Sequence, residues 1–142
     1  MKRPNRLALA RFAIWYTFVG LAVYIPLETF VTVSSAGWRG ILNQGYIANV
    51  IGMALMSWGA LSARNDRAAA PGLLAAGWAW TAATFWRATA QRFWAIEHGD
   101  ALYAGPIELW LAPIVTALAL LGMVASLALV VRSEPPAARH SS

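Results

Sequence analysis

The sequence contains no cysteine and little charge. Without cysteine the chain forms no disulfide, holds no iron–sulfur cluster through thiolates and has no thiol for catalysis. Asp, Glu, Lys and Arg make up 12% of its 142 residues, whereas they make up about 25% of a typical soluble domain. Because 59% of the residues are hydrophobic, much of the surface must face something other than water. Lipid is the environment that we expect.

The motifs of common enzymes are missing as well. The sequence has no HExxH, no phosphate-binding loop and no Ser-His-Asp set. Neither His98 nor His140 lies at membrane depth, which argues against a haem held by two histidines. His98 beside Glu97 and Asp100 is too small a set to predict a metal site. We therefore predict no catalytic and no metal-binding residues, and the sequence leaves any cofactor unknown.

Long apolar runs are what the sequence does contain. A helix needs about 20 mostly apolar residues to cross a bilayer. Four segments reach that length, at residues 7–33, 41–62, 71–93 and 106–131. We therefore predict one all-α domain over residues 1–132, an integral membrane antiparallel four-helix bundle. Residues 133–142, which include two prolines and two terminal serines, are predicted to form a disordered cytoplasmic tail.

The basic residues are unevenly distributed between the two ends of these segments. If the helices alternate in direction, one end receives eight of the eleven Lys and Arg residues, namely Lys2, Arg3, Arg6, Arg11, Arg64, Arg67, Arg132 and Arg139. The opposite end receives Arg39 and Arg92. Since cytoplasmic loops carry the excess of Lys and Arg, we expect a bacterial inner membrane protein with both termini in the cytoplasm. The same rule accounts for the net charge of +5 without nucleic acid as a partner.

Ionisable side chains inside a spanning helix cost about 2.5–3.5 kcal/mol each, so each one requires an explanation. Glu28, Arg87 and Glu108 are such residues, and Asn49 is a further polar residue at depth. At a rise of about 1.5 Å per residue, all of them fall in the outer half of the bilayer. Three interpretations are open for the ionisable residues. They form a structural network in which Arg87 pairs with the two carboxylates, they form a ligand or ion site that opens outward, or each side chain reaches the membrane interface separately.

Small and polar residues recur at helical spacing on every segment, so each segment has one face whose polar groups find no hydrogen-bond partners in lipid. These faces comprise Thr17, Gly20, Tyr24 and Glu28 on the first segment, Gly45, Asn49, Gly52, Met56 and Gly59 on the second, Gly77, Trp80, Thr84, Arg87 and Gln91 on the third, and Glu108, Ala112, Val115, Ala119, Gly122 and Ser126 on the fourth. We expect the faces to meet, with tight packing in the inner half and polar groups in the outer half.

The third segment is also rich in tryptophan. Trp78, Trp80 and Trp86 lie deeper than interfacial tryptophans do, and only Trp80 shares a face with Arg87. Packing within the bundle or against lipid is the simpler interpretation of all three. The alternative is a wall for a flat apolar ligand such as a quinone, sterol, carotenoid or lipid chain. The candidate ligand-binding residues are then Tyr24, Glu28, Asn49, Trp80, Thr84, Arg87 and Glu108.

Three classes of function remain open. The favoured one is binding of a hydrophobic ligand, or a role as an accessory subunit whose partner is another membrane protein or a second copy of this chain. A small transporter or channel could use Glu28, Arg87 and Glu108, but it needs a polar route through the inner half. A membrane-embedded enzyme with a carboxylate as acid or base ranks third, because no nucleophile accompanies the carboxylates.

The charge asymmetry yields a prediction about topology. Reporter proteins fused after Ser142 and inserted at Gly99 should give opposite signals, the first cytoplasmic and the second external, because an odd number of crossings separates these positions. Paired reporters that are active on opposite sides of the membrane would measure this. The same signal from both positions would contradict the four-helix topology.

Overall fold

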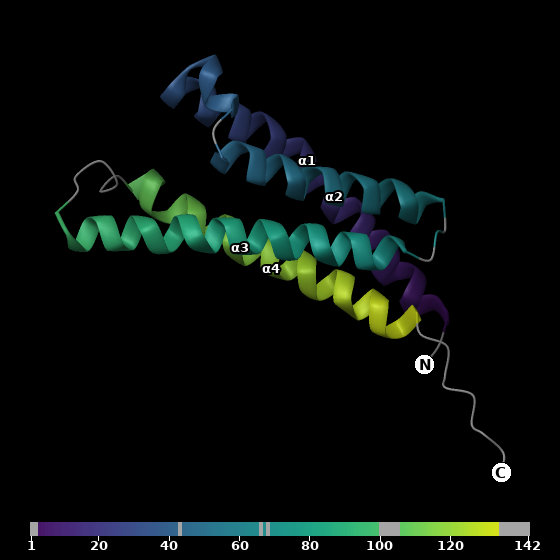
Figure 1. Ribbon diagram of the computed structural model, residues 1–142. Coiled ribbons are helices and arrows are strands. Elements are labelled where there is room, and N and C mark those ends of the chain that lie inside the picture. The colour runs from purple at the N-terminus through teal and green to yellow at the C-terminus, as the bar shows by residue number, and fades with distance from the viewer. Residues whose placement is uncertain (1–2, 43, 66, 68, 100–105, 134–142) are drawn as a thin grey trace, which may run out of the picture.

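The computed structural model describes residues 3–42, 44–65, 67, 69–99 and 106–133. These residues form four long helices, α1 (Arg3–Ala36), α2 (Gln44–Arg64), α3 (Ala70–Glu97) and α4 (Pro106–Ser133), and a short 3-10 helix, η1 (Trp38–Leu42). Consecutive long helices run in opposite directions (Figure 1), and the described residues include no strand. The predicted all-α four-helix fold is confirmed. The predicted tail lies outside the described residues, apart from its first residue, Ser133, which ends α4.

Three of the long helices can cross a membrane. The stretches Leu7–Ser34, Gly45–Arg64 and Trp110–Val131 are long and apolar enough to do so. The 28 residues of α3 would extend for about 42 Å, but α3 is not among the three because its tryptophans, threonines and arginines lower its mean hydropathy. It nevertheless packs along both α2 and α4. The chain is therefore an integral membrane protein, and among the described residues α3 is the one long helix without an apolar stretch of that kind.

Local backbone chemistry sets the helix boundaries. Gly37 follows α1 with a φ of 64°, a left-handed conformation that glycine adopts without strain. Its N–H donates to the carbonyl oxygen of Val33 at 2.9 Å, which closes the last turn of α1. The chain then forms η1, so that α2 begins at Gln44, three residues after the start of the apolar run.

The two ends of the bundle are named by their helices. The distal end is the end that contains η1, and the proximal end is the end where α1 begins and α4 ends.

Trp78 lies at the centre of the bundle, where only 5% of its surface is exposed. Its indole Nε1 donates to the hydroxyl of Thr17 at 3.0 Å, a bond between α3 and α1. Glycines make room for the ring: a Cβ added to Gly122 would lie 2.5 Å from a ring carbon of Trp78, and one added to Gly20 would lie 2.9 Å away. Of the two interpretations that the sequence allowed, packing within the bundle therefore holds for Trp78.

The proximal half of the α2–α3 interface is equally tight. A Cβ added to Gly77 would lie 2.7 Å from the backbone nitrogen of Met56, and one added to Gly59 would lie 2.8 Å from that of Leu74. Met56 and Leu74 are themselves fully buried. Small residues let helix backbones approach in a membrane, where lipid gives no hydrophobic drive for helix association. Close backbone contact therefore stabilises this half of the bundle.

The packing of Trp78 predicts a contrast between two glycines. Gly122→Ala should lower the free energy of unfolding by about 1–3 kcal/mol, because the added methyl group overlaps the indole ring and forces a backbone shift. Gly72→Ala should leave stability unchanged or raise it by up to about 1 kcal/mol, since no atom lies within 4 Å of the added Cβ. Equilibrium unfolding in mixed micelles of mild detergent and dodecyl sulfate measures both. Equal effects would contradict the packing described for Trp78.

Candidate functional site

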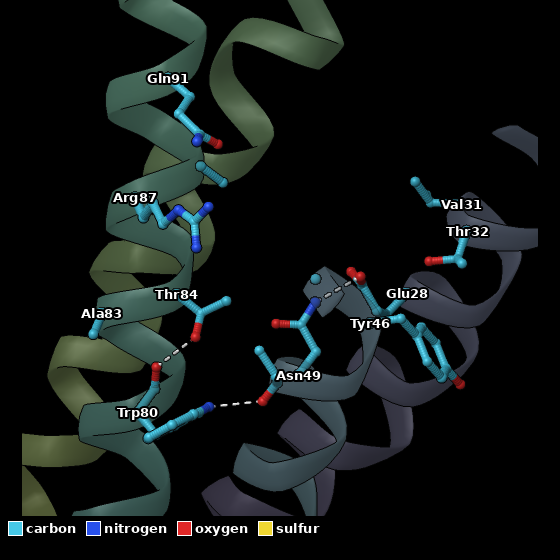
Figure 2. Close-up of a pocket in the computed structure, with 13 residues that line it drawn as sticks. Glu28, Val31, Thr32, Tyr46, Asn49, Trp80, Ala83, Thr84, Arg87 and Gln91 are labelled. Atoms are coloured by element: carbon cyan, nitrogen blue, oxygen red, sulfur yellow. Dashed lines mark hydrogen bonds between the residues drawn. The ribbon is translucent and has the colours of Figure 1, made fainter. Parts of the chain in front are cut away.

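A groove of about 640 Å³ lies in the distal half, between α3 and the pair α1–α2. Its lining comes from three helices: Glu28, Val31 and Thr32 from α1, Gly45, Tyr46, Ala48 and Asn49 from α2, and Trp80, Ala83, Thr84, Arg87, Ala88 and Gln91 from α3. Figure 2 shows the α3 side chains facing those of α1 and α2 across the groove.

Most of the candidate residues from the sequence line this groove. Five of them do so: Glu28, Asn49, Trp80, Thr84 and Arg87. Tyr24 is not part of the lining and instead packs against Phe85, with the ring centroids 5.3 Å apart. Glu108 belongs to the first turn of α4, and its side chain lies outside the part of the molecule that the structure describes. The geometry thus assembles five of the seven predicted residues, and their role in binding remains a prediction.

Glu28 and Asn49 form the polar wall of the groove on the α1–α2 side. The amide Nδ2 of Asn49 donates to Oε1 of Glu28 at 2.6 Å (Figure 2). Asn49 is only 8% exposed, and its other amide atom, Oδ1, is buried without a hydrogen-bond partner. The hydroxyl of Tyr24, one turn before Glu28 on α1, is a second buried polar atom without a partner. An unpaired buried group of this kind costs about 1–3 kcal/mol.

Arg87 stands on the opposite wall. It is exposed and points from α3 into the groove (Figure 2). The predicted direct ion pair between Arg87 and Glu28 is absent from the described side chains, because the groove separates their helices and Asn49 occupies the carboxylate. Distance along the helix axis predicted the depth of Glu28 and Arg87 but not the separation between their helices.

Trp80 forms the floor of the groove at its proximal end. Its indole Nε1 donates to the backbone carbonyl of Ala48 at 2.7 Å, which ties α3 to α2. Gly52 provides the space for this contact, because a Cβ there would lie 3.1 Å from the Trp80 ring. The hydroxyl of Thr84 donates to the carbonyl of Trp80 at 2.9 Å, so its proton is used within α3. With 43% of its surface exposed, Trp80 still presents part of the indole to the groove.

Sequence reasoning missed Tyr46, which also lines the groove. Its hydroxyl lies 3.0 Å from that of Thr29, a hydrogen bond that joins α2 to α1 beside the groove. The signal was present in the sequence: Tyr46 precedes Asn49 by three residues, so both lie on one helical face. It was overlooked because the face was identified from glycine, asparagine and methionine alone.

The polar wall predicts a measurable coupling between two residues. A double-mutant cycle with Asn49→Leu and Glu28→Met should give a coupling free energy of about 0.5–1.5 kcal/mol, the usual net contribution of such a hydrogen bond. Unfolding in mixed micelles provides the four stabilities. Gln91→Leu is the matched control: this exposed amide lines the same groove, and its replacement should change stability by less than about 0.5 kcal/mol. Strictly additive effects of the two substitutions would contradict the described bond.

Comparison with known proteins gives no relative. No protein-family model, no curated protein and no solved structure matches this chain. Support for a function therefore comes from the groove itself: its volume, its two polar walls and the indole at its floor.

Proposed function

We propose that this protein binds a hydrophobic small molecule that carries a hydroxyl group, in the groove between α3 and the pair α1–α2. The observation that carries the proposal is the pair of facing polar walls, with Glu28 and Asn49 on one side and Arg87 on the other. A hydroxyl group can donate to a carboxylate oxygen and accept from a guanidinium at the same time. Sterols, quinols and hydroxyl-bearing lipids carry such a group, whereas a hydrocarbon carotenoid carries none.

The size and lining of the groove support a ligand of this kind. Small-molecule sites usually enclose about 300–1,000 Å³ and combine apolar walls with a few polar groups, and the groove measures about 640 Å³. Val31, Ala83 and Ala88 supply apolar wall, and the Trp80 indole supplies a flat surface at the floor. A ring system would stack on the indole while its hydroxyl meets the polar walls.

The packing of the proximal half favours binding over transport. A transporter or channel needs a polar route beyond the groove, whereas Met56, Leu74 and Trp78 are buried on the proximal side of Trp80. Among the described residues, these side chains and the close glycine contacts around them fill the space around α3 on that side. A role as an accessory subunit of a membrane complex is the alternative if no small molecule binds.

Tryptophan fluorescence tests where the ligand binds. Titration of the purified protein in detergent with a sterol or a quinol should change its tryptophan emission, because Trp80 forms the floor of the groove. Trp80→Phe should abolish the change. Trp86→Phe should retain it, since Trp86 belongs to the same helix but is 65% exposed and does not line the groove.

The hydroxyl group provides the second arm of the test. A sterol should bind about tenfold more tightly than the matching sterane, which lacks the hydroxyl, because hydrogen bonds to charged groups contribute about 1.5–3 kcal/mol. Circular dichroism of each variant verifies that it is folded. Equal affinity for sterol and sterane, the same response from both tryptophan variants, or no response to any compound would each overturn the proposal.

A further inference from the structure

A second groove, of about 490 Å³, lies at the proximal end of the bundle, away from the first. Its lining consists of Arg11, Ile14, Trp15 and Phe18 from α1 and Arg64 from the last turn of α2. None of these residues belongs to the distal groove. The proximal groove thus combines two cations from different helices with an apolar wall supplied by α1.

The order of these residues along α1 matches the order of groups in a phospholipid. Arg64 ends the apolar stretch of α2 and Arg11 lies about one turn inside that of α1, whereas Phe18 lies about 10 Å deeper than Arg11 at the rise of a helix. Ile14 and Trp15 fall between them. Trp15 is 69% exposed, and tryptophan prefers the boundary between headgroups and acyl chains. Charge therefore lies at the headgroup level, and apolar surface continues from it into the bilayer.

The charges that line this groove favour the binding of an anion. Both arginines are exposed, and no carboxylate is among the five lining residues. Arg67 adds a third exposed cation at the same end of the bundle without lining the groove. The planar guanidinium group matches the oxygens of a phosphate in a bidentate manner, and basic pockets between helices at the membrane surface suit the headgroups of anionic lipids.

We propose that the proximal groove binds an anionic phospholipid, with its phosphate between Arg11 and Arg64 and one acyl chain along Ile14, Trp15 and Phe18. The apolar wall is what distinguishes a lipid from free phosphate, because an inorganic ion makes no use of it. The lipid also has a structural effect. Only 17% of the apolar window of α1 is buried within the protein, against 39% for α2, so a molecule that contacts both helices adds to a sparse interface.

Quenching of Trp15 by brominated lipids tests this site in the purified, full-length protein. The Trp15 signal is the difference between the wild type and Trp15→Phe in detergent micelles. Brominated phosphatidylglycerol should quench it at a mole fraction about 30-fold lower than brominated phosphatidylcholine, because each arginine near a lipid surface contributes about a fivefold preference for an anionic lipid. In the Arg11→Gln, Arg64→Gln double variant, the two lipids should quench at nearly equal mole fractions.

Matched controls separate this site from general charge effects. Arg67→Gln should keep the full preference, since Arg67 lies at the same end but not in the groove. Inorganic phosphate should displace phosphatidylglycerol no better than chloride of equal ionic strength. Equal quenching by the two lipids in the wild type, a preference that survives in the double variant, an equal loss in Arg67→Gln, or specific displacement by inorganic phosphate would each overturn the proposal. The substituted arginines are exposed in the native protein, so we expect the variants to fold. Circular dichroism verifies that they retain their helices.

Discussion

The bond between the Trp78 indole and the Thr17 hydroxyl is the contact on which the division of the bundle into two halves depends. It anchors α3 to α1 at 3.0 Å and holds a large ring between Gly20 and Gly122. With the ring in this place, α1, α3 and α4 can approach no further than its faces allow. Toward the proximal end the helices close around Met56 and Leu74. Toward the distal end, Tyr24 and Phe85 still join α1 to α3, and the groove opens beside them, beyond Trp80.

The floor of the groove is coupled to the same packing. Trp80 lies two residues beyond Trp78 on α3 and bonds the carbonyl of Ala48. That bond requires α2 to lie close to α3, which Gly52 permits because a side chain there would meet both Trp80 and Thr81. Asn49, next to Ala48, is thereby held at the edge of the groove. The position of the polar wall thus follows from glycine contacts more than from any interaction among the polar residues themselves.

The sequence was sufficient for the fold because apolar length and helical period are properties of single segments. The same period placed Asn49, Trp80 and Arg87 on faces that turn toward one another, and all three line the groove. It could not choose the partner of Glu28. Arg87 and Asn49 are both close to it in depth, and the choice between them depends on how far each helix is rotated and how far the walls stand apart.

Trp78 shows a different limit of the same reasoning. Its face on α3 is adjacent to the face of Trp80 and Arg87, and a lipid-facing position was compatible with the sequence. What decides its burial is the absence of side chains on the neighbouring helices at Gly20 and Gly122. The sequence of one helix does not show where a neighbouring helix leaves space for its side chains. That space is known only when the register between the helices is known.

Polar contacts determine the position of α1 more than apolar burial does. Lipid solvates apolar side chains as well as a neighbouring helix does, so hydrophobic burial gives little drive for helices to associate within a bilayer. Most of the apolar surface of α1 faces outward. Among the described residues, its side-chain hydrogen bonds to the other helices include those from Tyr16 to the carbonyl of Leu118 on α4, from Trp78 on α3 to Thr17, from Asn49 on α2 to Glu28, and between Thr29 and Tyr46 on α2.

These bonds lie in the middle and the distal thirds of α1, and both grooves take part of their lining from the same helix. The distal groove lies between α3 and the α1–α2 pair, and the proximal groove lies between α1 and α2, on the other side of the Trp78 contact. A ligand in either groove would therefore add contacts to α1, the spanning helix whose apolar window is least buried. In a bilayer a few polar bonds determine the position of a helix, so contacts with a ligand can stabilise α1 about as much as the contacts within the protein do.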